Sequence, residues 1–173
     1  MGRSSGWQNR SVGYNAFRSD LEDLMEQRVY FEDVEPGTRL PEREFGPHTL
    51  VAAIRWAGVQ ENPSPTHTDR EGARAMRGLK GIITSGAQRE SYLARMLMDW
   101  VSPRGDLRKL SLRHTASTFE GDMMRYSGTV IEKSPSAHDP WIVCEFEGKN
   151  QEGVQILRGQ CTLSLPSRPS GRQ

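Results

Sequence analysis

One segment, residues 82–101, constrains most strongly how this chain can fold. Its apolar and small side chains recur at helical spacing in two adjacent rows. The first row holds Ala87, Ser91, Ala94, Met98 and Val101, and the second holds Leu93, Leu97 and Trp100. A helix with so wide an apolar face is buried on more than one side, so other elements of the chain must enclose it.

Strands are the elements best suited to enclose this helix, and most of them follow it in the sequence. The predicted strands cover about residues 39–47, 107–119, 123–132, 141–148 and 154–165. Short helices are expected at 16–27, at 49–59 behind the N-cap Thr49, and at 69–76 behind the N-cap Asp69. This order predicts an α+β domain whose antiparallel sheet wraps around the long helix, which is the hot-dog arrangement. The same spacing also allows a cystatin-like sheet packed on one helix.

Length and charge limit what kind of protein this is. At 173 residues the chain suits one domain, which we expect over residues 16–166, between a disordered segment at 1–15 and a flexible tail at 167–173. The 23 basic and 22 acidic residues nearly balance, so no electrostatic feature suggests a nucleic-acid partner. No apolar run approaches the ~20 residues that a membrane span needs, and the N-terminus lacks the apolar core of a secretory signal. We therefore expect a cytoplasmic protein that does not bind a membrane.

Neither the cysteines nor the histidines have the spacing of a metal site. Cys144 and Cys161 fall in predicted strands, where we expect two small buried thiols in a reducing compartment; a disulfide across the sheet is the alternative. The histidines and carboxylates form no HExxH or H-x₃-H pattern, so no metal is expected.

The stretch QENPSPTHTD, residues 60–69, is the strongest candidate for a functional site. Pro63 and Pro65 fix their own backbone torsions and push the preceding residues towards extended geometry, so we expect a rigid polar turn and not a helix. Such a turn fixes the position of His67. A fixed position is consistent with a histidine that only stabilises the turn and with one that takes part in catalysis.

Four short motifs resemble those of the MaoC-like dehydratases, the (R)-specific enoyl-CoA hydratase group. The run YFEDVEPG at residues 30–37 resembles the start of that family, and residues 62–69 resemble its signature D-x-N-P-x-H-x-D when aligned on the histidine. Ser85-Gly86-Ala87 resembles the HGM motif at the start of the family's central helix, where a serine follows five residues after the glycine, as Ser91 does here. Phe119 to Asp122 resembles the end of F-x-x-P-V-x-x-G-D.

The resemblance implies a hydratase or dehydratase that adds or removes water at the double bond of an enoyl-CoA-type thioester. Coenzyme A is then part of the substrate, and no separate cofactor is expected. The family uses an aspartate and a histidine to handle the water and the proton, and a backbone N–H at the start of the helix to polarise the thioester carbonyl. The matching catalytic positions are His67 for the histidine, Gly86 for the N–H and Ser91 for a serine that helps to orient the catalytic groups.

The sequence departs from the family at the aspartate, where it has Asn62. An amide cannot accept a proton at neutral pH, so Asn62 can orient a water but cannot be a general base. Four outcomes stay open. His67 acts alone, Glu61 reaches into the site, a partner subunit carries the complete pair, or the reaction is different.

Two further functions therefore stand beside the hydratase. The first is a non-catalytic or partner-dependent acyl-CoA-binding subunit of a hetero-oligomeric dehydratase, because the chain also resembles the small MaoC-type subunits of steroid side-chain degradation. The second is a hot-dog thioesterase, which needs a carboxylate on the central helix; Glu90 lies on that helix but off its buried stripe. The open edge of a hot-dog sheet predicts a homodimer, or a heterodimer with another hot-dog subunit.

The remaining charged candidates lie outside these motifs. Four basic side chains cluster where a hot-dog dimer receives the phosphates of coenzyme A, and we expect them, with Glu61, to bind substrate; a solvated charged face is the alternative. They are Arg104, Arg108, Lys109 and Arg113. Three histidines belong to no constellation and are expected at the solvent or on the sheet surface. They are His48, His114 and His138.

Overall fold

The structure is a computed structural model that describes residues 29–101 and 103–168. The predicted disorder at 1–15 and the predicted helix at 16–27 lie outside these residues, as does most of the tail at 167–173.

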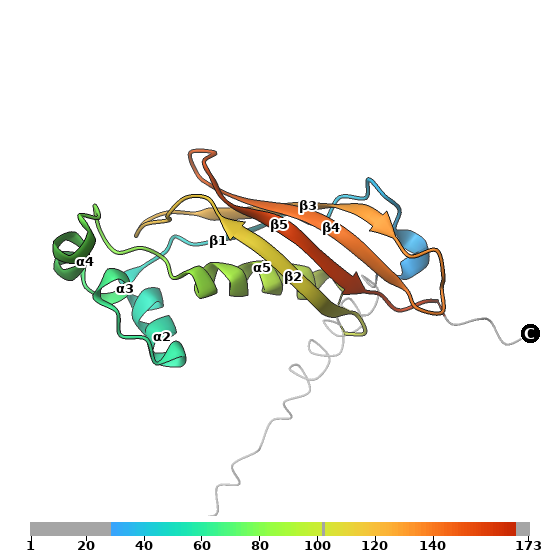
Figure 1. The fold of residues 1–173 in the computed structure, drawn as a ribbon, viewed down its shortest axis with the longest axis horizontal. Coiled ribbons are helices and arrows are strands. Elements are labelled where there is room, and N and C mark those ends of the chain that lie inside the picture. The colour runs from blue at the N-terminus through green and yellow to red at the C-terminus, as the bar shows by residue number, and fades with distance from the viewer. Residues whose placement is uncertain (1–28, 102, 169–173) are drawn as a thin grey trace, which may run out of the picture.

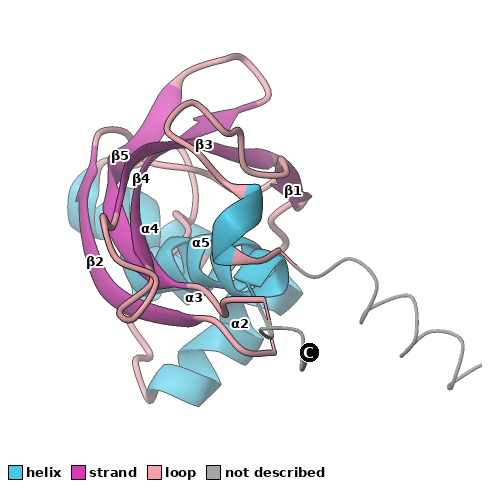
Figure 2. Ribbon diagram, turned by 90° about the vertical axis from the view of Figure 1, so that its right-hand side faces the viewer, coloured by secondary structure: helices cyan, strands magenta, loops and turns pink. Residues whose placement is uncertain are grey.

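Five antiparallel strands form one sheet in the order β1-β3-β4-β5-β2. The strands are β1 (Arg43–Phe45), β2 (Asp106–His114), β3 (Met124–Lys133), β4 (Trp141–Asn150) and β5 (Gln155–Ser164). The strand expected at 39–47 is shortened to β1 and an isolated bridge between Arg39 and Thr129, because Pro41 and Pro47 have no N–H to donate to a neighbouring strand. Figure 2 shows the sheet curving around the helix α5 (Gly86–Val101), as predicted.

The helix α5 supplies one side of the main apolar core. Leu93 and Leu97 are fully buried and belong to one cluster with Tyr126 and Phe146 of the sheet. The helix begins at Gly86 and not near residue 82 as expected. The four residues before it are not helical because Ile83 forms a β-bridge with Phe119.

Three short helices lie between β1 and α5 and gather beyond the N-terminal end of α5 (Figure 1). They are α2 (Leu50–Gln60), α3 (Pro65–Thr68) and α4 (Arg70–Arg77), and we call them the α2–α4 cluster. Both predicted N-caps are confirmed: Thr49 Oγ1 accepts from the N–H of Ala52 at 3.1 Å, and Asp69 Oδ1 accepts from the N–H of Glu71 at 2.9 Å. The expectation that residues 60–69 contain no helix is wrong at α3, because a proline at the first helical position costs no hydrogen bond.

Smaller features complete the fold. A 3₁₀ turn, η1 (Phe31–Asp33), replaces part of the extended piece expected at 30–37. Cys144 and Cys161 face each other across β4 and β5, and both are buried free thiols, as predicted. No helix in the described part of the chain combines the length and the apolar character needed to cross a membrane.

Candidate functional site

His67 is fixed at the end of α3 by a hydrogen bond to the backbone that leads into α5. Its Nδ1 lies 2.8 Å from the carbonyl oxygen of Ile83. A carbonyl only accepts, so Nδ1 carries a proton, and Nε2 is the nitrogen that can exchange a proton in a reaction. The N–H of Ile83 in turn donates to the carbonyl of Thr66 at 2.9 Å, so α3 is tied to this segment through two adjacent residues.

The segment before α5 is also held from its other side. Ile83 pairs with Phe119, and the N–H of Thr84 donates to the carbonyl of Thr118 at 2.9 Å. Residues 83 and 84 therefore connect His67 to the first turn of α5 and fix the position of one relative to the other. A change in α3 or in residues 118–119 would disturb this arrangement.

The first turn of α5 presents free backbone donors. No hydrogen bond of the described residues uses the N–H of Gly86, Ala87 or Gln88, as expected for the start of a helix. The helix has 16 residues, so its aligned peptide dipoles add a partial positive charge at this end. These donors can stabilise negative charge on a substrate oxygen. Gly86 was predicted as such a donor, and that role stays a prediction.

Asn62 and Glu61 are exposed where α2 joins α3. Glu61 ends α2 in the left-handed region at φ 51°, and Asn62 Oδ1 accepts from the N–H of Ser64 at 3.3 Å. Within the described residues, no hydrogen bond joins either side chain to His67. The amide of Asn62 therefore closes a local turn, and its predicted part in orienting a water is untested.

Ser91 is half-buried one turn into α5, and its hydroxyl donates to the carbonyl of Gln88 at 2.8 Å. This bond is local to the helix. The oxygen keeps its capacity to accept a hydrogen bond, and the orienting role of Ser91 stays a prediction.

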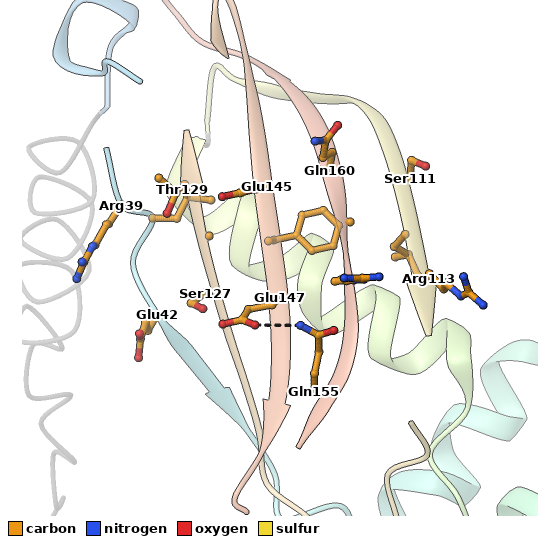
Figure 3. Close-up of a pocket in the computed structure, with 16 residues that line it drawn as sticks. Arg39, Glu42, Ser111, Arg113, Ser127, Thr129, Glu145, Glu147, Gln155 and Gln160 are labelled. Carbon is orange, nitrogen blue, oxygen red and sulfur yellow. Dashed lines mark hydrogen bonds between the residues drawn. The ribbon is translucent and has the colours of Figure 1, made fainter. Parts of the chain in front are cut away.

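The basic residues predicted to bind phosphate do not form one cluster. Arg104, Arg108 and Lys109 lie at or after the C-terminal end of α5, which is about 22 Å along the helix from Gly86. Arg108 is paired there with Asp139 at 2.8 Å. Arg113 lies nearer the N-terminal end of α5 but lines a groove of about 870 Å³ on the outer face of the sheet (Figure 3).

Sequence reasoning missed a carboxylate–imidazole pair at the same end of α5. His114, the last residue of β2, lies with Nε2 2.9 Å from Glu90 Oε1. A β-carbon built on Gly86 would lie only 3.1 Å from the same Nε2. The alternation along β2 could have found it, because Leu110, Leu112 and His114 share the face that turns towards α5.

Two more polar side chains are buried near this end. His48 is 2% exposed, and burial lowers the pKa of its ring. Neither ring nitrogen has a hydrogen-bond partner within the described part of the chain. Arg89 is also buried, which lowers the pKa of its guanidinium, and its side chain donates to the carbonyl of Ala116 at 2.6 Å. The surface position expected for His48 is therefore wrong.

Within residues 29–101 and 103–168, no three His, Cys, Asp or Glu side chains gather as ligands of a metal would. The candidate site is formed by His67, the donors at Gly86 and the Glu90–His114 pair.

Among known proteins, the chain is similar to solved structures only, and not to a family model or a curated sequence. A MaoC-like dehydratase from Rhodospirillum rubrum is 23% identical with a TM-score of 0.72, over 82% of this chain and 99% of that one. The (R)-hydratase PhaJ1 of Pseudomonas aeruginosa is 21% identical with a TM-score of 0.71, over 82% and 88%.

A third similar structure is a chain of the ChsH1–ChsH2 complex of Mycobacterium tuberculosis. It is 20% identical with a TM-score of 0.67, over 76% of this chain and 98% of that one. The chain has the hot-dog fold. This confirms the predicted α+β class and decides against the cystatin-like alternative, because the curved sheet encloses α5 as it does in these proteins.

Proposed function

We propose that this protein is a hydratase or dehydratase that adds or removes water at the double bond of an enoyl-CoA-type thioester. The observation that carries the proposal is the fixed imidazole of His67. Its Nδ1 donates to the carbonyl of Ile83, and among the described residues no hydrogen bond uses its Nε2 or the N–H groups of the first turn of α5, which begins three residues later. The similarity in fold to an (R)-hydratase and a MaoC-like dehydratase supports this choice among hot-dog activities.

Each group has a defined task in the proposed reaction. The thioester carbonyl accepts from the N–H of Gly86, which stabilises the enolate that forms when water adds to C3. His67 exchanges a proton with the substrate or water through Nε2. Asn62 can hold a water but cannot take its proton.

A substrate assay with one variant tests the proposal. We expect the wild-type chain to hydrate short- or medium-chain trans-2-enoyl-CoA, and His67→Ala to lower kcat by about 10²–10⁴-fold, the contribution typical of a general acid–base group. His138→Ala, which changes an exposed loop histidine, is the matched control and should keep the wild-type rate. Equal rates for wild type and His67→Ala would remove His67 from the mechanism.

A dimer is part of the proposal. In the described residues β2 is an edge strand, paired with β5 along one side. A second hot-dog chain, identical or different, would pair with the open side of β2. Native mass spectrometry of the purified protein measures this, and a monomer at micromolar concentration would contradict it.

The second candidate is a partner-dependent acyl-CoA-binding subunit. The position of Asn62 favours it, because the amide is exposed and engaged in its own turn. Similarity to a chain of the two-protein ChsH1–ChsH2 complex favours it as well. No hydration by the isolated chain, with acyl-CoA binding retained, would select this candidate over the first.

A further inference from the structure

Glu90 and His114 form a hydrogen-bonded pair beside the first turn of α5. The imidazole Nε2–H donates to Glu90 Oε1 at 2.9 Å, because a carboxylate only accepts. The two side chains are 42% and 31% exposed, so the pair is accessible to a small molecule. Among the described residues Oε2 of Glu90 makes no hydrogen bond, so it is free to take a proton.

The pair is directed towards the same helix terminus as the proposed carbonyl site. A β-carbon on Gly86 would lie 3.1 Å from Nε2 of His114, which is closer than such contacts normally are. With a side chain at residue 86, the imidazole would have to shift by a few tenths of an ångström relative to Glu90. The glycine thus keeps the pair close to the backbone donors of the first turn.

The end of β2 that carries His114 is held by a buried arginine. Arg89 donates to the carbonyl of Ala116, just after β2, at 2.6 Å, and to the carbonyl of Ile156, in β5, at 3.4 Å. These two hydrogen bonds link the end of β2 to the start of β5 through α5. Arg89 is also the charged neighbour of Glu90 on α5, and it has no carboxylate partner in the described part of the chain. The position of the imidazole is therefore set by β2, β5 and α5 together.

We propose that Glu90, held by His114, is the general base that takes the proton from water in the proposed reaction, in place of the carboxylate that Asn62 cannot supply. This inference rests on the proposed hydratase function. Glu90 is then a catalytic residue together with His67, and His114 is a positioning residue that acts through Glu90.

In the proposed step, water adds across the C2=C3 double bond of the thioester. Glu90 Oε2 takes a proton from water while the water oxygen bonds to C3, and the C2=C3 electron pair moves onto the thioester as an enolate. The enolate oxygen accepts from the N–H of Gly86. The electron pair then returns to C2, which takes a proton from Nε2–H of protonated His67. The proton on Glu90 passes through solvent to His67, which restores both groups.

The test compares isosteric variants of both members of the pair with controls elsewhere in the protein. Glu90→Gln keeps the acceptor for His114 but cannot take a proton, and we expect kcat for enoyl-CoA hydration to fall about 10²-fold or more with KM little changed. Asp99→Asn is the matched control, since Asp99 is an ion-paired carboxylate at the far end of the same helix. Asp99→Asn should keep the wild-type rate.

Two rescue experiments separate catalysis from structure. Added formate should restore activity to Glu90→Ala in a concentration-dependent way and should not restore His67→Ala. His114→Gln, which can still donate to Glu90, should keep most of the activity that His114→Leu loses. Circular dichroism and thermal unfolding of each variant confirm that it is folded.

The outcomes separate this inference from the proposed function. Wild-type kcat in Glu90→Gln, with His67→Ala inactive, would overturn the inference and leave the hydratase in place. Absence of hydration by the wild-type chain would overturn both. Release of free coenzyme A that depends on Glu90, without hydration, would also overturn both and would assign the pair to thioester hydrolysis. Loss in Glu90→Gln with formate rescue of Glu90→Ala supports the inference.

Discussion

The two ends of α5 are surrounded by different chemistry. Towards its C-terminus, Leu93, Leu97 and Val101 are at most 2% exposed and pack into the apolar core under the sheet. Around its N-terminus, several buried side-chain nitrogen and oxygen atoms have no hydrogen-bond partner within the described part of the chain. They belong to His48, Trp56, Thr84, Arg89, His114 and Thr118.

This difference separates the part of the molecule that stabilises the fold from the part suited to chemistry. A buried polar group that makes no hydrogen bond at all costs about 1–3 kcal/mol. Proteins keep such groups where a substrate or ordered water uses them. The polar end carries His67 and the Glu90–His114 pair, so the candidate site lies at the end where buried polar side chains gather.

The largest effect is expected at the apolar end. Leu97→Ala removes a fully buried side chain from the main core and should lower the free energy of unfolding by about 2–5 kcal/mol. Urea denaturation followed by circular dichroism measures this loss. A loss below about 1 kcal/mol would mean that the two ends do not differ in packing as the structure indicates.

Lowering the pH should reduce the free energy of unfolding through His48, which lies at the polar end. Burial lowers the pKa of His48 in the folded state, against the opposing charges of Glu120 and Asp122, while in the unfolded chain it titrates near pH 6.5. Below that pH the unfolded state binds more protons than the folded state, so stability falls as pH falls. We expect this residue to cost up to about 1.4 kcal/mol per pH unit below pH ~6.5.

The matching measurement is the free energy of unfolding between pH 7 and pH 5. His48→Gln should flatten the decline, and His138→Gln, at an exposed loop position, should leave it unchanged. Equal slopes for His48→Gln and wild type would assign the acid sensitivity to other groups.

A smaller change of opposite sign is expected for Thr118→Val. The hydroxyl is fully buried and has no partner within the described residues, and valine has nearly the same shape without the polar atom. The variant should gain about 1 kcal/mol in free energy of unfolding. A clear loss, measured by the same denaturation, would show that the hydroxyl is bonded in solution.

The smallest effect is expected at the surface link between the α2–α4 cluster and the loop after Phe119. Arg70 and Glu120 form two hydrogen bonds at 2.7 and 2.6 Å, but the arginine side chain is 52% exposed. Arg70→Gln should cost less than about 1 kcal/mol, and less still in high salt. A larger cost would mean that this ion pair is needed to hold the cluster in place.

Much of the fold was predictable because its signals are local. The N-caps Thr49 and Asp69 follow from side chains that bond to backbone within three residues, and the late strands follow from alternation bounded by turns. The start of α5 was not predictable in this way. Ile83 leaves the helical pattern to pair with Phe119, and nothing within residues 82–85 indicates that partner.

The candidate site likewise has one part that could be predicted from local sequence and one part that could not. His67 was found because prolines and a polar turn mark it locally, whereas Glu90 and His114 are 24 residues apart and meet through tertiary packing. The predicted phosphate-binding group combines basic residues that are close in the sequence, between 104 and 113. In the structure Arg108 and Arg113 lie near opposite ends of that strand, and Arg113 faces the outer groove.

The amino-acid sequence by itself determined that a long buried helix packs against an antiparallel sheet, and that His67 lies in a proline-bounded turn with an amide at residue 62. Periodicity and turn chemistry act over a few residues, so they can be recognised without the fold. The tertiary structure alone decided that His67 uses Nδ1 to bond to Ile83, and that Glu90 and His114 meet beside Gly86. Both depend on hydrogen bonds between residues 16 or more apart, whose geometry exists only after the α2–α4 cluster, α5 and β2 have packed together.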